Sequence, residues 1–320
     1  MSAIDWPEKT RELHNHHFDS TVWNDFVFRD DDIVIANYSK SGSTWLQQIV
    51  GQLVFGGALD VELAEVTWWV DMRVPPKDVK LARLEAQQHR RFVKTHLPLD
   101  ALVFSPSAKY LYIGRDGRDV AWSLFNHHVN ANQGWYDSVN EPPGRVGPPL
   151  EPPTTDDPVQ YFRDWLAGDG WPFWSFWDNV RTWWPARRLP NVLMLHFRDL
   201  KADLEREIRK IAAFLAIDVD AGAWPRILEH CGFEYMKTHA DRLAPRRGAY
   251  WDDGGEVFFH RGVDGRWREL LPEADGRRYE DMAVAELGPE CARWLATGEL
   301  PRAADRPTPK RVDAGDARTP

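Results

Sequence analysis

Short apolar runs alternate with helical patterns along this chain, and that alternation constrains the fold more than any other feature. Four compact runs are rich in β-branched, leucine or aromatic residues, as is typical of strands covered on both faces. They occupy residues 33–37 (IVIAN), 91–95 (RFVKT), 110–114 (YLYIG) and 192–197 (VLMLHF). Helical patterns lie between them, at 42–54, 118–129 and 205–215. Because strands that alternate with helices form parallel sheets with helices on both faces, the sequence predicts a single α/β domain with a central, mostly parallel sheet.

Two proline-rich segments interrupt this pattern. Residues 142–158 contain seven prolines, too many for a helix or a central strand. We expect a long loop there, and long loops in compact domains are often lids. The tail 301–320 is polar and proline-rich, which predicts disorder. The domain is therefore expected over residues 1–300.

Composition narrows the class of function. The chain is 43% hydrophobic, enough for a sizeable core, and its net charge of −9 argues against a nucleic-acid partner, which would need a basic face. Two cysteines make neither a disulfide framework nor a metal cluster, so a reducing cytoplasm is expected. The first twenty residues lack the apolar core of a signal peptide, and the apolar stretch 49–59 is too short to span a bilayer. These features predict a soluble cytoplasmic protein.

Basic side chains follow three of the four predicted strands. Lys40 comes after the first, Lys94 and His96 end the second, and Arg115 follows the third. Ligands of open parallel sheets bind at the carboxyl ends of the strands. The three strand ends therefore predict an anion site in an otherwise acidic protein.

The first of these loops, YSKSGSTW (38–45), runs directly into a predicted helix. The backbone amides of Ser41–Trp45 would face an anion at the helix N-terminus, Gly42 would let the backbone approach closely, and the hydroxyls of Ser43 and Thr44 would add donors. A Walker loop has a second glycine directly followed by lysine, whereas here Lys40 precedes a single glycine. A simple N-cap with a solvated lysine stays open as an alternative for this loop alone.

The stretch KTHLP suits acid–base chemistry. An imidazole can accept a hydroxyl proton near neutral pH, so His96 fits a general base beside Lys94, although a lone histidine would be read as structural. No apolar run ends in an aspartate that could hold Mg²⁺ for phosphoryl transfer. We therefore expect a site that acts by positioning and electrostatics without a metal.

Four segments, in the same order along the chain, resemble those of a known family, the cytosolic-type sulfotransferases that use 3′-phosphoadenylyl sulfate. YSKSGSTW resembles the family's 5′-phosphosulfate loop, KTHLP its catalytic stretch, RDGRDVAWS (115–123) its 3′-phosphate segment, and HRGVDGRW (260–267) its late glycine-containing segment. The order and spacing hold from about Asp30 to Leu270. The resemblance implies a P-loop-like phosphosulfate site and a sulfotransferase activity.

The resemblance also implies roles for individual residues. Lys40 would contact the bridging oxygen of the leaving group, His96 would deprotonate the acceptor hydroxyl, and Lys94 would bind the transferring sulfonate. Ser123 completes the implied catalytic set and also grips the 3′-phosphate. The implied nucleotide-binding residues are Lys40, Ser41, Gly42, Ser43, Thr44, Trp45, Arg115, Ser123, Phe233, Arg261 and Gly262, with Trp45 and Phe233 on the two faces of the adenine.

The chain departs from the family pattern at several positions. Phe197 replaces a tyrosine, Cys231 a threonine, His260 an arginine and Arg266 an aspartate, while the catalytic set is intact. The family's dimer-forming stretch is not matched by RELLPEADGRRYE, so a homo-oligomer is left open.

Aromatic density predicts where the acceptor would bind. The chain has seventeen tryptophans, with a dense cluster at 171–184, and pockets for small molecules are mostly apolar. We expect the acceptor pocket to be built from this cluster, the proline-rich loop and the four tryptophans Trp68, Trp69, Trp174 and Trp177. The HNHH tract (14–17) is expected at the surface, and His127 and His128 are expected to pack, with one of them a candidate for the acceptor pocket.

The resulting prediction is an enzyme that moves a sulfuryl group from 3′-phosphoadenylyl sulfate to a hydroxyl of a small, largely apolar phenol or alcohol. The transfer would be an in-line displacement with His96 as base, adenosine 3′,5′-bisphosphate as product and no metal. Two alternatives stay open, a small-molecule kinase of the P-loop type and a non-catalytic nucleotide-binding module.

Overall fold

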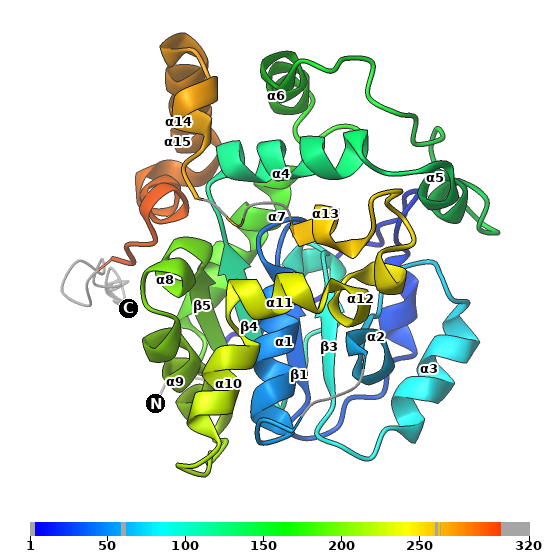
Figure 1. The fold of residues 1–320 in the computed structure, drawn as a ribbon, viewed down its shortest axis with the longest axis vertical. Coiled ribbons are helices and arrows are strands. Elements are labelled where there is room, and N and C mark those ends of the chain that lie inside the picture. The colour runs from blue at the N-terminus through cyan, green and yellow to red at the C-terminus, as the bar shows by residue number, and fades with distance from the viewer. Residues whose placement is uncertain (1–3, 59–61, 260–261, 263, 302–320) are drawn as a thin grey trace, which may run out of the picture.

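The central feature of the computed structural model is a parallel sheet of five strands, in the order β2-β3-β1-β4-β5 (Figure 1). The structure describes residues 4–58, 62–259, 262 and 264–301. The strands are β1 Ile33–Ala36, β2 Thr67–Trp69, β3 Phe92–Thr95, β4 Lys109–Gly114 and β5 Val192–His196. Every pairing in the sheet is parallel, as the alternation of strand and helix patterns predicted.

Helices connect and cover the strands. In chain order they are α1 Ser43–Val54, α2 Leu63–Val66, α3 Lys77–Ala86, α4 Gly117–Val129, α5 Gln133–Asn140, α6 Pro158–Ala167, α7 Phe176–Trp183, α8 Phe197–Ala202, α9 Leu204–Leu215, α10 Trp224–His230, α11 Phe233–Thr238, α12 Ala240–Leu243, α13 Gly255–Phe259, α14 Trp267–Leu270 and α15 Glu273–Thr297. Helices lie on both faces of the sheet, as Figure 1 shows, with α1, α9 and α10 packed beside one another on one of them.

The two faces bury two separate cores because successive side chains of a strand point to opposite sides. On β1, Ile33 and Ile35 belong to the core shared with α1, α9 and α10. Val34 and Ala36 belong to the core shared with α4, α7 and α15. All four residues are fully buried, which explains why the strand has no polar alternation.

The sequence located most of this architecture. The four predicted strands and the three predicted helices are confirmed, with ends that differ by at most one residue. The prediction missed β2, which has only three residues and directly follows the short helix α2. Between α5 and α6 the described chain has no helix or strand, as expected for the proline-rich segment. The predicted disordered tail lies outside the described residues from 302 onward.

The strand order determines where a ligand can bind. β1 lies between β3 and β4, so the loops that leave the carboxyl ends of these three strands lie side by side. This point, where the chain moves to the other side of β1, is a topological switch point of the kind that holds ligands in open α/β sheets. In the part of the chain that is described, no helix is long and apolar enough to cross a membrane.

Candidate active site

The loop between β1 and α1 takes a backbone shape that only glycine accommodates well at its end. Gly42 precedes α1 with φ +113°, and a Cβ there would lie 3.0 Å from the Phe197 ring. The first intrahelical bond runs from the Leu46 amide to the Gly42 carbonyl, so the amides of Ser43, Thr44 and Trp45 precede the helical ladder and are available to an anion.

Two lysines of this edge line one cavity of about 260 Å³. Lys40, with φ +64°, places its ammonium 4.3 Å from the centre of the Phe258 ring. Lys94 places its ammonium 4.9 Å from that of Trp69. Burial, helped by Arg115 and Lys94, lowers the pKa of Lys40 to about 7, and burial lowers the pKa of Lys94 to about 8. Two cations that share a poorly solvated space favour an anionic ligand.

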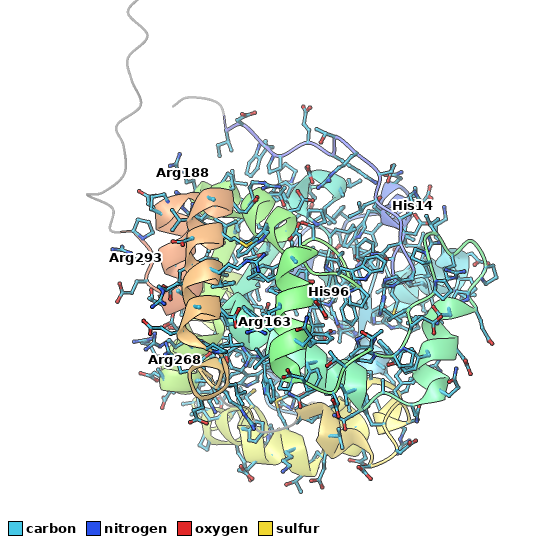
Figure 2. The ribbon with its side chains drawn as sticks, turned by 90° about the horizontal axis from the view of Figure 1, so that it is seen from above. His14, His96, Arg163, Arg188, Arg268 and Arg293 are labelled. Atoms are coloured by element: carbon cyan, nitrogen blue, oxygen red, sulfur yellow. The ribbon has the colours of Figure 1, made fainter. Side chains whose placement is uncertain are left out.

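His96 follows β3 and lies inside the molecule (Figure 2). Its Nδ1 is 2.7 Å from the carbonyl oxygen of Asn37. A carbonyl can only accept, so Nδ1 carries the proton and, in the neutral ring, Nε2 has a free lone pair. Burial, together with the nearby Lys94 and Lys40, holds the pKa of His96 well below its usual value. The ring is therefore neutral and oriented, the state that a general base requires.

The end of the cavity near Arg115 collects the residues implied for the nucleotide. Arg115 donates to the Lys40 carbonyl at 3.1 Å and lies over the Phe197 ring. Ser123, Trp45, Phe233 and Gly262 line the same space. The Trp45 indole N–H donates to the Cys231 carbonyl at 2.8 Å, a backbone contact that the cysteine side chain does not affect. Arg261, which the resemblance implied, lies outside the described residues.

Ser41 differs from the expected arrangement. Its amide donates to the Tyr38 carbonyl at 3.2 Å, and the residue is 2% exposed and does not line the cavity. The loop turns back on itself at Ser41, so its amide is used within the loop while those that begin α1 face outward.

At the other end of the cavity, two indoles pack against the imidazole of His96. The Trp69 ring meets His96 edge to face at 4.6 Å, and the Trp174 ring stacks on it at 5.7 Å. The Trp69 N–H donates to buried Asp71 at 2.6 Å, which fixes that indole. Trp69 and Trp174 line the cavity as predicted.

The other two predicted tryptophans do not line it. Trp68 alternates with Trp69 along β2, so it points to the opposite face, where the Arg83 guanidinium covers it. Trp177, in the first turn of α7, is buried and packs on Tyr279 in the core. No residue of 142–158 lines the cavity among those the structure describes, so the lid remains a prediction.

The histidines also fall differently from expectation. The prediction that the HNHH tract is at the surface is wrong for His16 and His17, which are 5% and 6% exposed, and right only for His14. His16 and His17 are buried because the chain there lies beside the segment that follows β2, where Phe18 bridges to Met72. His17 lines the cavity.

Of the pair on α4, His128 packs and bonds to the Glu151 carbonyl at 2.8 Å. His127 lines the cavity. Helical spacing contained this signal, because His127 follows Ser123 by four residues and so lies on the same helix face.

Several cavity residues were not foreseen. They come from the segment before α13 and from α13 itself, from α4, and from the residue before α14, and they include Trp122, Asn126, Tyr250, Trp251, Val257, Phe258 and Arg266. Asn126 could have been found by its spacing from Ser123. Trp122 directly precedes Ser123, and Arg266 lies in the late segment that was compared with the family. Tyr250, Trp251, Val257 and Phe258 offered no local signal, since residues 245–259 reach the cavity only through the tertiary fold.

In the described ranges no three histidine, cysteine, aspartate or glutamate side chains gather as metal ligands. The absence of a metal requirement stays a prediction.

Comparisons with known proteins agree with this geometry. A family model described as a sulfotransferase domain matches residues 30–288. A glycolipid sulfotransferase of Mycobacterium bovis is 33% identical over 303 residues, covering 88% of this chain and 92% of that protein. Mouse sulfotransferase 1B1 is 31% identical over 266 residues, covering 80% and 82%.

Solved structures share the fold. The mouse sulfotransferase SULT7A1 complexed with PAP superposes with a TM-score of 0.66 at 23% identity, covering 86% of this chain and 91% of that one. Retinol dehydratase in complex with androsterone and inactive cofactor PAP gives a TM-score of 0.63 at 22% identity, covering 83% of each chain.

Proposed function

The chain belongs to the sulfotransferase family, and from that premise we propose that it transfers a sulfuryl group from 3′-phosphoadenylyl sulfate to a hydroxyl of a small, largely apolar acceptor. The observation that carries the proposal is the convergence of Lys40, Lys94 and Arg115 with a neutral, oriented His96 on one cavity. Family membership favours this activity over a kinase or a non-catalytic binding module.

The cavity suits an anionic donor. Five cationic side chains line it and, among its described lining residues, there is no aspartate or glutamate; the five are Lys40, Lys94, Arg115, Lys201 and Arg266. Burial lowers the pKa of both Lys40 and Lys94, and Asp71 offsets this only in part for Lys94, so each ammonium group would gain from a further negative charge. An anion would supply that charge, and the amides at the start of α1 would bind its oxygens.

When bound, 3′-phosphoadenylyl sulfate supplies an activated sulfuryl group whose leaving group is a phosphate. We assign Lys40, with the amides of Ser43 and Thr44, to the 5′-phosphate end, where negative charge grows as the bond breaks. Lys94 is assigned to the sulfonate, and Arg115 and Ser123 to the 3′-phosphate. Preorganised charge of this kind stabilises a transition state without reorganisation during the reaction.

His96 is assigned as the general base. Its Nδ1–H is held by the Asn37 carbonyl, so Nε2 accepts the proton of the acceptor hydroxyl. The flanking indoles of Trp69 and Trp174 keep the ring from rotating and shield it from water. The low pKa keeps the imidazole neutral at pH 7, and the neighbouring lysines oppose its protonation until an anionic ligand offsets their charge.

The test separates catalysis from binding. Wild-type protein is incubated with 3′-phosphoadenylyl sulfate and a panel of phenols and alcohols, and sulfated product is measured by mass spectrometry. We expect His96→Ala to lose turnover by roughly 10²–10⁴-fold, the usual contribution of a general base, and to keep its affinity for adenosine 3′,5′-bisphosphate. Arg115→Ala is expected to weaken that affinity by roughly tenfold or more, because it removes charge-assisted hydrogen bonds.

Each alternative has its own signature. Strict dependence on ATP and Mg²⁺ would indicate a kinase. Tight nucleotide binding without sulfated product from any acceptor would indicate a binding module.

We also propose a cytoplasmic location. Cys231 and Cys291 are both free and buried, as is common in proteins of reducing compartments. Export of the protein with its activity retained would contradict this location.

A further inference from the structure

A second imidazole in the cavity has no part in the mechanism above. His17 lines the same space as His96 and is 6% exposed. Its ring lies 6.0 Å from Trp69 and 5.6 Å from Trp174, the two indoles that also flank His96. The two histidines are therefore neighbours across one pair of tryptophans.

The hydrogen bonds of His16 determine which nitrogen of His17 carries a proton. His16 Nε2 lies 2.8 Å from the Pro172 carbonyl oxygen, which can only accept, so Nε2 is protonated. In neutral His16 the Nδ1 atom is then an acceptor, and it faces His17 Nδ1. His17 Nδ1 must therefore donate, which leaves His17 Nε2 as a lone-pair acceptor.

Both rings are kept neutral by their surroundings. Burial lowers the pKa of His16. Burial, with the neighbouring imidazoles of His16, His127 and His96, holds the pKa of His17 well below its usual value. The relay from the Pro172 carbonyl through His16 to His17 is thus stable at neutral pH, and its free end is an acceptor.

This free end has little else to bind. Within the described part of the chain, the contact with His16 is the only hydrogen bond that the His17 ring makes. The rings of Trp135 and Phe173 lie beside it, together with the two shared indoles. Because His17 lines the cavity, a ligand that brings a donor to this point would hydrogen-bond to the free nitrogen.

We propose that His17 is a specificity-determining residue that accepts a hydrogen bond from a second hydroxyl of the acceptor substrate. The preferred acceptors are then compact diols, apolar between their two hydroxyls, one of which reacts at His96 while the other is held at His17. This inference rests on the proposed function for the identity of the reacting hydroxyl. The recognition by His17 itself is a binding property and can be measured without turnover.

The expected size of the effect follows from hydrogen-bond energetics. A site that bonds a substrate hydroxyl rejects the analogue that lacks it, because its own polar group is left unpaired. One such bond in a buried site corresponds to roughly 5- to 100-fold in affinity. A diol should therefore bind more tightly than its matched mono-ol by that factor, after correction for two equivalent hydroxyls in a symmetric diol.

Matched pairs of acceptors supply the experiment: naphthol against naphthalenediol, and phenylphenol against dihydroxybiphenyl. Binding to the protein with adenosine 3′,5′-bisphosphate is followed by tryptophan fluorescence, and kcat/KM is measured with 3′-phosphoadenylyl sulfate. The variant His17→Phe keeps a flat ring and removes the acceptor nitrogen. His17→Leu serves if the first does not fold, as judged by circular dichroism.

We expect at least one diol to be preferred roughly 5- to 100-fold by wild type, and that preference to disappear in the His17 variant. His14→Phe is the control, because His14 is the exposed histidine of the same tract and pairs with Asp19 at the periphery (Figure 2). It should keep the wild-type ratio.

Two results would overturn the inference. One is a diol-to-mono-ol ratio that is the same in wild type and the His17 variant for every pair. The other is an equal loss of kcat for both members of a pair, which would make His17 a second base. If diols bind selectively through His17 but no acceptor is sulfated, the proposed function fails and the recognition stands. If sulfated products form but diols are not preferred, the proposed function stands and the recognition by His17 fails.

Discussion

Raising the pH from about 7.5 to about 9 should weaken the binding of adenosine 3′,5′-bisphosphate by roughly 25-fold, because Lys40 must be charged to hold the 5′-phosphate. Its pKa in the free protein is about 7, lowered by burial and by the charges of Arg115 and Lys94. A bound phosphate favours the ammonium form and raises this pKa again. Binding therefore takes up a proton, and the affinity is full below the free pKa and falls as the pH rises through it.

The magnitude follows from that single pKa. With a free pKa of about 7, the neutral fraction of Lys40 is large at about pH 7.5 and nearly complete at about pH 9. The cost of protonating it grows by roughly 25-fold, or about 2 kcal/mol, over this range. Both phosphates are already fully ionised there, since their second pKa is roughly 6, so they do not mask the trend.

Isothermal titration calorimetry in buffers of different ionisation enthalpy measures both quantities. At about pH 8 we expect the uptake of about 0.9 proton from Lys40. The pKa of Lys94 is about 8, so a Lys94→Arg background removes the second titrating lysine. Lys40→Arg is the matched control, because a guanidinium stays charged throughout and should give a flat pH profile. An equal pH slope in wild type and Lys40→Arg, or no proton uptake, would refute the argument.

Two further predictions concern stability and the acceptor. Gly42→Ala should lower the free energy of unfolding by more than about 1 kcal/mol and weaken nucleotide binding, because φ is +113° and the new Cβ would lie 3.0 Å from Phe197. Denaturant unfolding measures the first effect and nucleotide titration the second. An unchanged unfolding midpoint would contradict the predicted backbone strain. Trp174→Ala should raise the KM for the acceptor, since Trp174 lines the cavity. Trp177→Ala should instead cost about 3–5 kcal/mol of stability with little change in KM, because Trp177 packs on Tyr279. Steady-state kinetics and thermal unfolding measure the two effects, and a raised KM in Trp177→Ala with an unchanged KM in Trp174→Ala would contradict the assignment.

The anion-binding half of the site could be predicted from the sequence, because its residues directly follow strands that are visible as apolar runs. Lys40, Lys94 and Arg115 each follow such a run, and a parallel sheet brings the carboxyl ends of its strands to one edge. Even in this half, the sequence did not show which backbone amides face the cavity and which are bonded within the loop. Ser41 reads as one more donor in the loop, but the turn that gives Lys40 a positive φ directs the Ser41 amide to Tyr38.

The acceptor-binding half of the site was less predictable, because a high density of aromatic residues does not tell which way each side chain points. Trp68 and Trp69 are adjacent in the sequence, yet the pleat of β2 sends one to the cavity and the other to the opposite face. β2 itself was not identified, so no alternation could be assigned. The segment before α13 and the helix itself close the cavity through contacts that depend on the whole tertiary structure, and nothing local in their sequence indicates this.

Two of the imidazoles that line the cavity, His96 and His17, illustrate the limit of what the sequence could predict. Each has one nitrogen tied to a backbone carbonyl and the other left as an acceptor, His96 directly through Asn37 and His17 through His16. His96 directly follows β3, which is visible in the sequence as an apolar run, so the sequence placed it correctly at the carboxyl edge of the sheet. The carbonyl that orients His17 belongs to Pro172, 156 residues from His16. Because the partner that sets the protonation of His16 and His17 is so distant in the sequence, the sequence alone suggests surface histidines. The specificity for the acceptor substrate is therefore the part of the proposed function that only the structure could suggest.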